Sequence, residues 1–219
     1  MALKAVLFDM DGVIVNTEPL HRKAYFEMFA HFNIDVSEEL YNSFTGKATL
    51  GICQELVQRF ALSAAPEELI AKKRERFKVL FDNDPEFDLI PGVRELIENY
   101  HQNDIKMVLA SSASMTTINW VFERFGLEEY FIDKISGADL KASKPHPEIF
   151  ELAAKKAGED RKDCMVIEDS TNGIKAAHAA GIYCIAYNSE HSKDQDYSLA
   201  QQVISDYKTI HVENLNQPV

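Results

Sequence analysis

The sequence predicts an α/β protein in which a parallel β-sheet is covered by helices and one helical segment is inserted. Short runs of apolar and β-branched residues alternate with longer stretches of helical periodicity through most of the chain. This alternation is typical of parallel sheets with helices on their faces. One interval, residues 16–81, has helical periodicity without a convincing strand. We therefore expect an α/β core domain of residues 1–15 and 82–219 and a helical domain of residues 16–81.

Five expected strands and several amphipathic helices give the order of the elements. The strands are apolar runs at residues 5–8, 106–110, 132–136, 165–167 and 183–186. Two core helices are predicted because apolar residues recur on one face, namely Val93, Leu96, Ile97 and Tyr100 in the first and Ile118, Val121, Phe122 and Phe125 in the second. The insert is helix-like at residues 22–32, 50–60 and 66–81, and a polar, turn-forming stretch follows.

Length, composition and charge limit the class of protein. The chain has 219 residues, which suits one main domain with a smaller insertion, and 46% of them are hydrophobic, enough for a buried core. The net charge of −12 disfavours nucleic acid and anionic membranes as partners, because both reward clustered Lys and Arg. An acidic protein that binds a phosphate ester must supply positive charge locally, from a metal ion or a few placed cations.

The cysteines and the N-terminal segment indicate no disulfide and no membrane anchor. Cys53, Cys164 and Cys184 are odd in number, widely spaced and set in apolar surroundings, so we expect buried free thiols. The first apolar run ends at Asp9 without a basic segment before it, so neither a signal peptide nor a spanning helix is predicted. We expect a cytoplasmic protein, and a monomer is compatible with a sequence that leaves the oligomeric state open.

Polar residues follow four of the expected strands, at the edge where ligands bind in open α/β sheets. Asp9 follows the first strand and Ser111 the second, while Lys144 lies in a loop past the third. Glu168 and Asp169 follow the fourth. Because the carboxyl ends of parallel strands meet at one edge of a sheet, we expect the chemistry to converge there.

The pair Asp9 and Asp11 is the candidate catalytic motif. The Asp-x-Asp spacing recurs at residues 82–84 and 194–196, but only Asp9-Met-Asp11-Gly12 follows an apolar strand and ends in a glycine, which permits a sharp turn. Two close carboxylates repel unless a cation lies between them, and Mg²⁺ prefers carboxylate, water and phosphate oxygens. Asp9 is placed to attack phosphorus and Asp11 to act as acid and base. The alternative is an aspartate that only caps the turn.

Phosphate binding is the functional interpretation of the next two elements. Ser111 and Ser112 open a Ser-Ser-Ala-Ser run whose hydroxyls and N–H groups suit a phosphate, although a helix cap is the commoner role of such a serine. Lys144 precedes Pro145, which fixes the backbone beside it. The lysine would offset the charge of phosphate and Asp9, unless it is an ordinary solvated lysine.

Glu168 and Asp169 are the candidate metal ligands that accompany Asp9. An acidic pair at a helix N-terminus also serves as a simple cap that is favourable to the helix dipole. Next to Asp9 across adjacent strand ends, the pair instead completes a metal site. No zinc motif, nucleophile elbow or dinucleotide fingerprint competes, and Gly46-Lys47 lacks the flanking residues of a P-loop.

Together these four elements resemble the motifs of the haloacid dehalogenase superfamily. Asp9-Met-Asp-Gly-Val-Ile is similar to its first motif, Ser111 to its second, Lys144-Pro to its third, and Glu168 with Asp169 to its fourth. The resemblance implies a Rossmann-like core and Mg²⁺ bound by Asp9, the Asp11 backbone carbonyl and Asp169, with Glu168 in or next to the ligand shell. The dehalogenase branch lacks the second aspartate, so Asp11 points to phosphoryl transfer.

The helical insert resembles the small cap of the subgroup that contains β-phosphoglucomutase and sugar-phosphate phosphatases. This implies a cap that closes over the substrate. His21 stands where mutase-like sequences also carry a histidine, with a solvated histidine as the alternative. Gly46 and Lys47 lie in a polar loop that agrees with the family, and Lys47 is a candidate contact for a distal group. Thr49 stands where the mutase presents an arginine.

We expect a Mg²⁺-dependent phosphatase that hydrolyses a small phosphorylated metabolite, such as a sugar phosphate, through a phosphoaspartate on Asp9. A hexose-phosphate mutase is the alternative with the same chemistry, favoured by His21 and disfavoured by Thr49. A non-catalytic binding or regulatory protein on the same fold is the third hypothesis. The residues that choose the ester are expected in the cap.

Overall fold

The structure is a computed structural model that describes residues 3–44, 49–189, 192 and 194–215. The chain divides into two compact units. The core unit comprises Met1–Asn16 and Asp88–Val219, and the helical unit comprises Thr17–Phe87. The helical unit ends later than the expected residue 81, because its last helix continues to Asn83 and the Phe87 ring contacts the Phe81 ring at 5.0 Å.

The core unit is built on one sheet of six parallel strands in the order β3-β2-β1-β4-β5-β6. The strands are β1 (Ala5–Phe8), β2 (Lys106–Ser111), β3 (Asp133–Ser136), β4 (Cys164–Glu168), β5 (Tyr183–Tyr187) and β6 (Gln202–Ile204). Every residue of β1 is buried, as expected for a central strand covered on both faces. Sequence reasoning missed β6, a three-residue edge strand whose middle residue, Val203, is 49% exposed.

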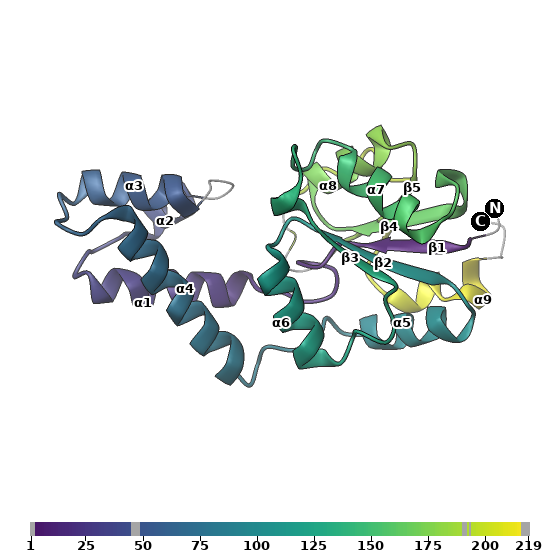
Figure 1. Cartoon of the computed structure of the whole chain (residues 1–219), viewed down its shortest axis with the longest axis horizontal. Coiled ribbons are helices and arrows are strands. Elements are labelled where there is room, and N and C mark those ends of the chain that lie inside the picture. Colours follow the sequence, from purple (N-terminus) through teal and green to yellow (C-terminus); the bar gives the residue numbers. More distant parts are fainter. Residues whose placement is uncertain (1–2, 45–48, 190–191, 193, 216–219) are drawn as a thin grey trace. The chain divides into compact units, whose positions relative to one another are not determined.

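Helices cover both faces of this sheet, so the predicted α/β fold with a parallel sheet is confirmed. In Figure 1, α7 (Glu148–Ala157) and α8 (Thr171–Ala179) lie above the sheet, and α5 (Val93–Gln102) and α6 (Met115–Phe125) lie below it. Ala5 and Leu7 of β1 pack with the apolar residues of α7 and α8, whereas Phe8 contacts Tyr100 of α5. This alternation follows the two-residue period of a strand.

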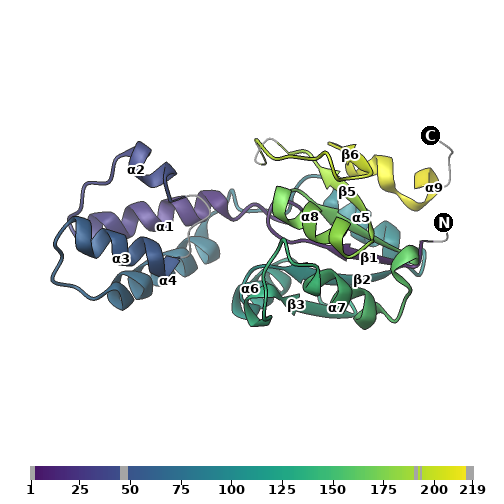
Figure 2. The ribbon, with the colours of Figure 1, turned by 90° about the horizontal axis from the view of Figure 1, so that it is seen from above.

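Short helices and a C-terminal segment complete the core unit. The 3₁₀ turns are η1 (Gly137–Asp139), η2 (Arg161–Asp163) and η3 (Tyr207–Ile210), and α9 (Val212–Leu215) follows η3. Figure 2 shows β6 at the edge of the sheet opposite to β3. The Tyr207 hydroxyl donates to the carbonyl of Val13 at 2.6 Å, and its ring stacks on Tyr187. The C-terminal segment therefore supports the loop that follows β1.

The helical unit consists of α1 (Glu18–His31), α2 (Glu38–Asn42), α3 (Thr49–Arg59) and α4 (Pro66–Asn83). Helix α4 packs against both α1 and α3. A separate apolar core, which includes Met28, Cys53, Leu56 and Leu69, lies among these helices. Within residues 17–44 and 49–87 the structure contains no strand, in agreement with the helical periodicity of the sequence.

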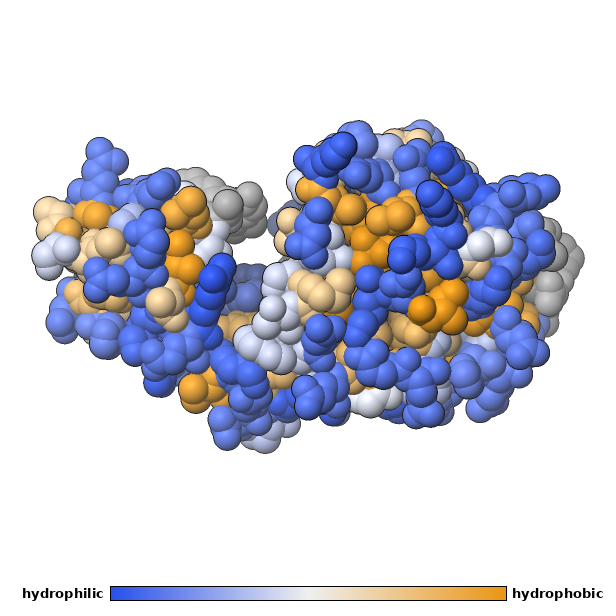
Figure 3. All heavy atoms as spheres, in the orientation of Figure 1, coloured by the Kyte–Doolittle hydropathy of each residue, from blue (hydrophilic) through white to orange (hydrophobic). Residues whose placement is uncertain are grey.

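The surface and the cysteines show no special feature. Figure 3 shows hydrophilic residues around smaller apolar areas on the face in view. Among the described residues, the large apolar side chains that are exposed stand on separate segments: Leu50, Val79, Ile132 and Val203. Such scattered exposure is normal. All three cysteines are free and buried, as predicted. In the part of the chain that the structure describes, none of the helices is both long and apolar enough to cross a bilayer.

Candidate active site

The loop after β1 places the first aspartate at the carboxyl end of the sheet. The Asp9 N–H donates to the carbonyl of Ile167 in β4 at 3.0 Å, and the Asp9 side chain is buried. Gly12 then turns the chain with φ +82°, a conformation that L side chains rarely adopt. A Cβ on Gly12 would lie 1.9 Å from Asp169 Oδ2. The glycine is therefore required twice, by the turn and by the close approach of Asp169.

Lys144 lies at the centre of the candidate site. Its Nζ donates to Asp9 Oδ1 at 2.5 Å, to the Ala110 carbonyl at 2.9 Å and to Glu168 Oε1 at 2.8 Å. The side chain is only 5% exposed, which rules out the solvated surface lysine considered from the sequence. Three acceptors match the three protons of the ammonium group. Lys144 therefore fixes the orientation of Asp9 and joins the ends of three neighbouring strands.

Glu168 is held by several groups at once. Its Oε2 accepts from the N–H groups of Asp169 and Ser170, both at 2.8 Å, and from the Ser170 hydroxyl at 3.0 Å, while Oε1 accepts from Lys144. A Cβ on Gly173 of α8 would lie 1.6 Å from Oε1. The small residue in α8 thus leaves space for a buried carboxylate. Both oxygens of Glu168 are engaged, and one of them anchors Lys144.

Asp169 completes a cluster of three carboxylates. Carboxylate oxygens of Asp9, Glu168 and Asp169 all lie within 4.8 Å of one another, an arrangement that could hold a metal ion. The Ser192 hydroxyl donates to Asp169 Oδ2 at 2.5 Å. Ser192 was not predicted from the sequence, because it lies in the segment after β5, and no spacing rule connects it to the four motifs.

The charges of this cluster are not balanced by Lys144. Burial raises the pKa of Asp9, and the Glu168 and Asp169 charges add to this effect against the opposing Lys144 charge. Burial, followed by the Glu168 charge, also raises the pKa of Asp169, to about 7. Burial disfavours the charge on Lys144, but Asp9 and Glu168 outweigh it and raise the lysine pKa. Three carboxylates, two of them buried, near one ammonium group form a donor set that suits a hard divalent cation.

The remaining predicted core residues lie in the same region. Asp11 is half-buried in the loop after β1, and its charge contributes to the raised pKa of Asp169. Ser111 ends β2 and is buried, and its hydroxyl accepts from the Ala113 N–H at 3.1 Å. The N-cap of α6 is Ser114, so Ser111 is not the helix cap considered from the sequence. Ser112, by contrast, is exposed.

The helical unit contains a second polar pair, formed by the half-buried His21 and the buried Lys73. The His21 ring stacks on Phe77 at 4.3 Å, and Lys73 Nζ lies 2.9 Å from His21 Nδ1. Burial, followed by the Lys73 charge, lowers the pKa of His21 to about 3, and burial lowers the pKa of Lys73 to about 8. His21 is therefore half-buried against Phe77 and Lys73 and is not the fully solvated histidine considered from the sequence. Lys73 was missed, although it interrupts the apolar row Leu69, Phe77 and Phe81 on α4.

The other residues predicted in the helical unit are only partly described. Thr49 begins α3, and its Oγ1 accepts from the Tyr25 hydroxyl at 3.5 Å. Gly46 and Lys47 lie outside the described residues. Their expected contact with a substrate therefore stays a prediction.

A family model of haloacid dehalogenase-like hydrolases matches residues 3–181. The chain belongs to this family. A phosphorylated carbohydrates phosphatase from Thermotoga maritima is 31% identical over 91% of this chain and 91% of its own length. The fructose-1-phosphate phosphatase YqaB from Escherichia coli is 29% identical over 81% and 92%. The crystal structure of CbbY from Rhodobacter sphaeroides in complex with phosphate has a TM-score of 0.81 and 25% identity, covering 98% of this chain and 100% of that one.

These similarities confirm the family predicted from the four motifs and the Rossmann-like core that the family implies. They also confirm the prediction that the chain is an enzyme of the phosphatase kind. The matched segment, residues 3–181, includes Asp9, Ser111, Lys144 and Asp169, but it ends before Ser192.

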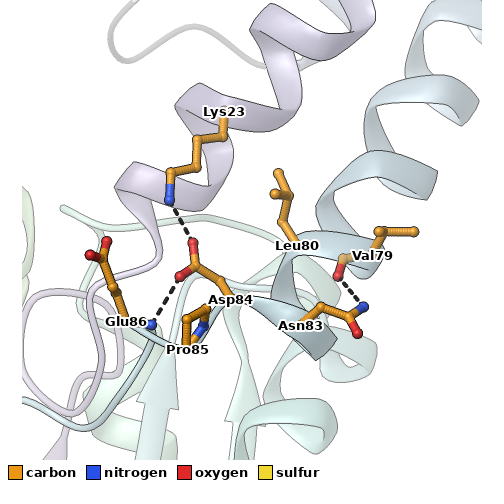
Figure 4. Close-up of a pocket in the computed structure, with 7 residues that line it drawn as sticks. All are labelled: Lys23, Val79, Leu80, Asn83, Asp84, Pro85 and Glu86. Carbon is orange, nitrogen blue, oxygen red and sulfur yellow. Dashed lines mark hydrogen bonds and ion pairs between the residues drawn. The ribbon is translucent and has the colours of Figure 1, made fainter.

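One pocket of this hydrolase lies in the helical unit and contains none of the predicted site residues. It is lined by Lys23, Val79, Leu80, Asn83, Asp84, Pro85 and Glu86 (Figure 4). Lys23 Nζ donates to Asp84 Oδ2 at 2.6 Å, and the Glu86 N–H donates to Asp84 Oδ1 at 2.9 Å. The charges of Lys23 and Asp84 thus satisfy each other. We assign no function to this pocket.

Proposed function

We propose that this chain is a Mg²⁺-dependent phosphatase that hydrolyses a small phosphorylated metabolite, such as a sugar phosphate. The observation that carries the proposal is the buried Asp9, which is held by Lys144 at the carboxyl ends of β1 and β4 next to two further carboxylates. The phosphatases of phosphorylated carbohydrates among its relatives support this class of substrate. The net charge of −12 requires local positive charge before any phosphate can bind.

Asp9 and Asp169, with the backbone carbonyl of Asp11, would hold the metal ion. When bound, Mg²⁺ supplies positive charge beside the phosphate and offsets the repulsion among the carboxylates. Glu168, with both oxygens engaged by Lys144, Ser170 and backbone N–H groups, acts by holding the lysine. This assignment makes Glu168 a supporting residue next to the ligand shell.

The chemistry is carried by the two aspartates in two steps. Asp9 attacks phosphorus, so that a bond forms between its carboxylate oxygen and phosphorus while the bond to the ester oxygen breaks. Asp11 gives its proton to that leaving oxygen. Asp11 then removes a proton from a water molecule, which attacks the phosphoaspartate and releases inorganic phosphate. Ser111 and Ser112 are proposed to bind the phosphate oxygens, and Lys144 to balance their charge.

We assign the choice of ester to the helical unit as the cap that the resemblance implies. The candidates are His21, Gly46, Lys47 and Thr49, together with Lys73, which the structure adds to the group through its contact with His21. The pKa values of the buried lysine and of the half-buried histidine beside it are both lowered, and groups with shifted pKa values cluster at functional sites.

The experiment that tests the function is the release of inorganic phosphate from a panel of sugar phosphates, with Mg²⁺ or with EDTA. We expect turnover only with Mg²⁺ and a loss of at least about 1,000-fold in Asp9→Asn, which keeps the shape but removes the nucleophile. Asp82→Asn, in another Asp-x-Asp pair, is the matched control and should keep full activity. An unchanged rate in Asp9→Asn, or no turnover of any ester, would contradict the proposal.

A second measurement separates hydrolysis from phosphoryl transfer to a sugar. The enzyme is incubated with Mg²⁺, β-glucose 1-phosphate and a trace of the bisphosphate. We expect free phosphate to appear. Glucose 6-phosphate formed without free phosphate would replace the phosphatase with a hexose-phosphate mutase.

A further inference from the structure

The segment between β5 and β6 is fastened to the turn between β4 and α8. The Ser192 hydroxyl donates to Asp169 Oδ2 at 2.5 Å. The Thr171 N–H donates to Gln195 Oε1, and the Asp196 N–H donates to Thr171 Oγ1, both at 2.8 Å. These three hydrogen bonds all meet the few residues that follow Glu168. The segment is therefore bound to the part of the site that carries the proposed metal ligand.

Ser192 is itself fixed in this position. Its side chain is buried, its N–H donates to Ser189 Oγ at 3.1 Å, and its carbonyl accepts from the Tyr197 hydroxyl at 3.2 Å. The Ser189 and Ser192 hydroxyl oxygens lie 2.9 Å apart. Since the single proton of the Ser192 hydroxyl is directed at Asp169, the hydroxyl of Ser189 is the donor between the two serines. The result is a short relay that ends on the carboxylate.

The hydrogen bond from Ser192 opposes the electrostatic repulsion among the carboxylates of the site. Asp169 lies close to Asp9 and Glu168, and the negative charge of Glu168 disfavours the charged form of Asp169. Without a partner, rotation of the carboxylate away from the other two would relieve this repulsion. The same oxygen, Oδ2, also approaches Gly12 so closely that a Cβ there would lie 1.9 Å from it. Asp169 Oδ2 thus lies against Gly12 and accepts from Ser192.

We propose that Ser192 is a positioning residue that holds the Asp169 carboxylate in the orientation needed to bind the divalent cation. The inference rests on the proposed function, in which Asp169 is a metal ligand. The Ser192 hydroxyl occupies one lone pair of Asp169 Oδ2. The second lone pair of Oδ2 and both lone pairs of Oδ1 stay available to the metal. Hydrogen-bond partners of metal ligands fix ligand orientation, and their loss typically weakens metal binding about 10- to 100-fold.

Isothermal titration of the metal-free full chain with Mg²⁺ tests this inference. We expect Ser192→Ala to weaken Mg²⁺ binding about 10- to 100-fold and Ser192→Thr, which keeps the hydroxyl, to stay within about threefold of the unaltered protein. Tyr197→Phe is the matched control, because it removes a hydrogen bond to the Ser192 carbonyl and leaves the hydroxyl in place. It should bind Mg²⁺ within about twofold of the unaltered protein. Near-ultraviolet circular dichroism checks that each variant is folded.

Asp169→Asn separates failure of this inference from failure of the proposed function. If Asp169→Asn abolishes Mg²⁺ binding while Ser192→Ala binds as the unaltered protein does, the inference is overturned and the proposed function stands. Equal weakening in Ser192→Ala and Tyr197→Phe would assign the effect to loop packing and overturn the inference as well. If the unaltered protein binds no Mg²⁺, the metal site of the proposed function fails, and the inference fails with it.

Discussion

Lys144 in the core unit and Lys73 in the helical unit are both buried lysines, and their pKa values move in opposite directions. Burial disfavours the charge in both places. Around Lys144, the carboxylates of Asp9 and Glu168 outweigh burial and raise the pKa. Around Lys73 lie the His21 ring nitrogen and the faces of Tyr25 and Phe77, and burial lowers the pKa to about 8.

The opposite pKa shifts show that the two units surround a buried lysine with different charges. In the core unit the charge is compensated, so the lysine stabilises the fold and the site together. In the helical unit burial, which lowers the pKa of Lys73, outweighs the attraction of Glu18, so we expect Lys73 to lower stability at neutral pH. Residues that cost stability are expected where function needs them. The following substitutions test this comparison, beginning with the largest expected effect.

Lys144→Met is expected to lower the free energy of unfolding by about 3–5 kcal/mol, because it leaves Asp9 and Glu168 facing each other without a counter-charge. Urea denaturation followed by circular dichroism measures the change. Lys156→Met is the control in the same unit, since Lys156 pairs with Asp133 and its side chain is half exposed. This control should change stability by less than about 1 kcal/mol. An unchanged free energy of unfolding in Lys144→Met would show that the Lys144 charge does not compensate the charges of Asp9 and Glu168.

The two helical glycines, Gly173 and Gly51, are expected to respond with opposite signs when changed to alanine. Gly173→Ala places a methyl group 1.6 Å from Glu168 Oε1 and should cost about 1–3 kcal/mol of stability. Gly51→Ala in α3 meets no atom within 4 Å and should add up to about 1 kcal/mol through helix propensity. Urea denaturation of both variants checks the difference. A stable Gly173→Ala would show that Glu168 can move freely.

Lys73→Met is expected to raise the free energy of unfolding by about 1–3 kcal/mol, because methionine fills the same space without a charge. The measurement is again urea denaturation at pH 7. Lys72→Met is the control on the same helix, because Lys72 pairs with Glu75, and it should change stability by less than about 1 kcal/mol. Destabilisation by Lys73→Met would indicate that its contacts with His21 and the aromatic rings outweigh the cost of burial.

The lowered pKa of His21 should be detectable in the pH dependence of stability. Its pKa in the folded protein, about 3, lies below the ordinary value of 6.5. Between these values the unfolded chain binds a proton that the folded chain does not, so this contribution to stability is present above pH 6.5 and is lost as the pH falls. From pH 6.5 to 5.5 we expect His21 to contribute a loss of about 1 kcal/mol, so the change in stability over this range is less favourable by that amount in the unaltered protein than in His21→Gln. The raised pKa of Asp169 acts in the opposite direction in both proteins, so the difference between them is the quantity to measure. His101→Gln, at an exposed histidine, should match the unaltered protein, and no difference between His21→Gln and the unaltered protein would contradict the assignment.

The proximity of the core-site residues could be predicted from the sequence because their positions follow a local rule. Asp9, Lys144 and Asp169 each come directly after a strand or in the loop beyond it, and parallel strand ends must meet. Ser192 and Lys73 follow no such rule. Their roles depend on contacts with Asp169 and His21, which are 23 and 52 residues away along the chain. Strand β6 was missed for a related reason, since three residues at an edge, Gln202 to Ile204, are too few to show a periodicity.

The position of β1 in the middle of the sheet also governs how the site is made. Ala5 of β1 pairs with Lys106 of β2 and with Cys164 of β4. Translation proceeds at about 5–20 residues per second, so strand β4 is synthesised roughly 10–30 s after β1. Such non-local pairing makes folding slow. Asp9 is thus synthesised well before Glu168 and Asp169, so that a chain interrupted before β4 carries the proposed nucleophile without the two neighbouring carboxylates of the site.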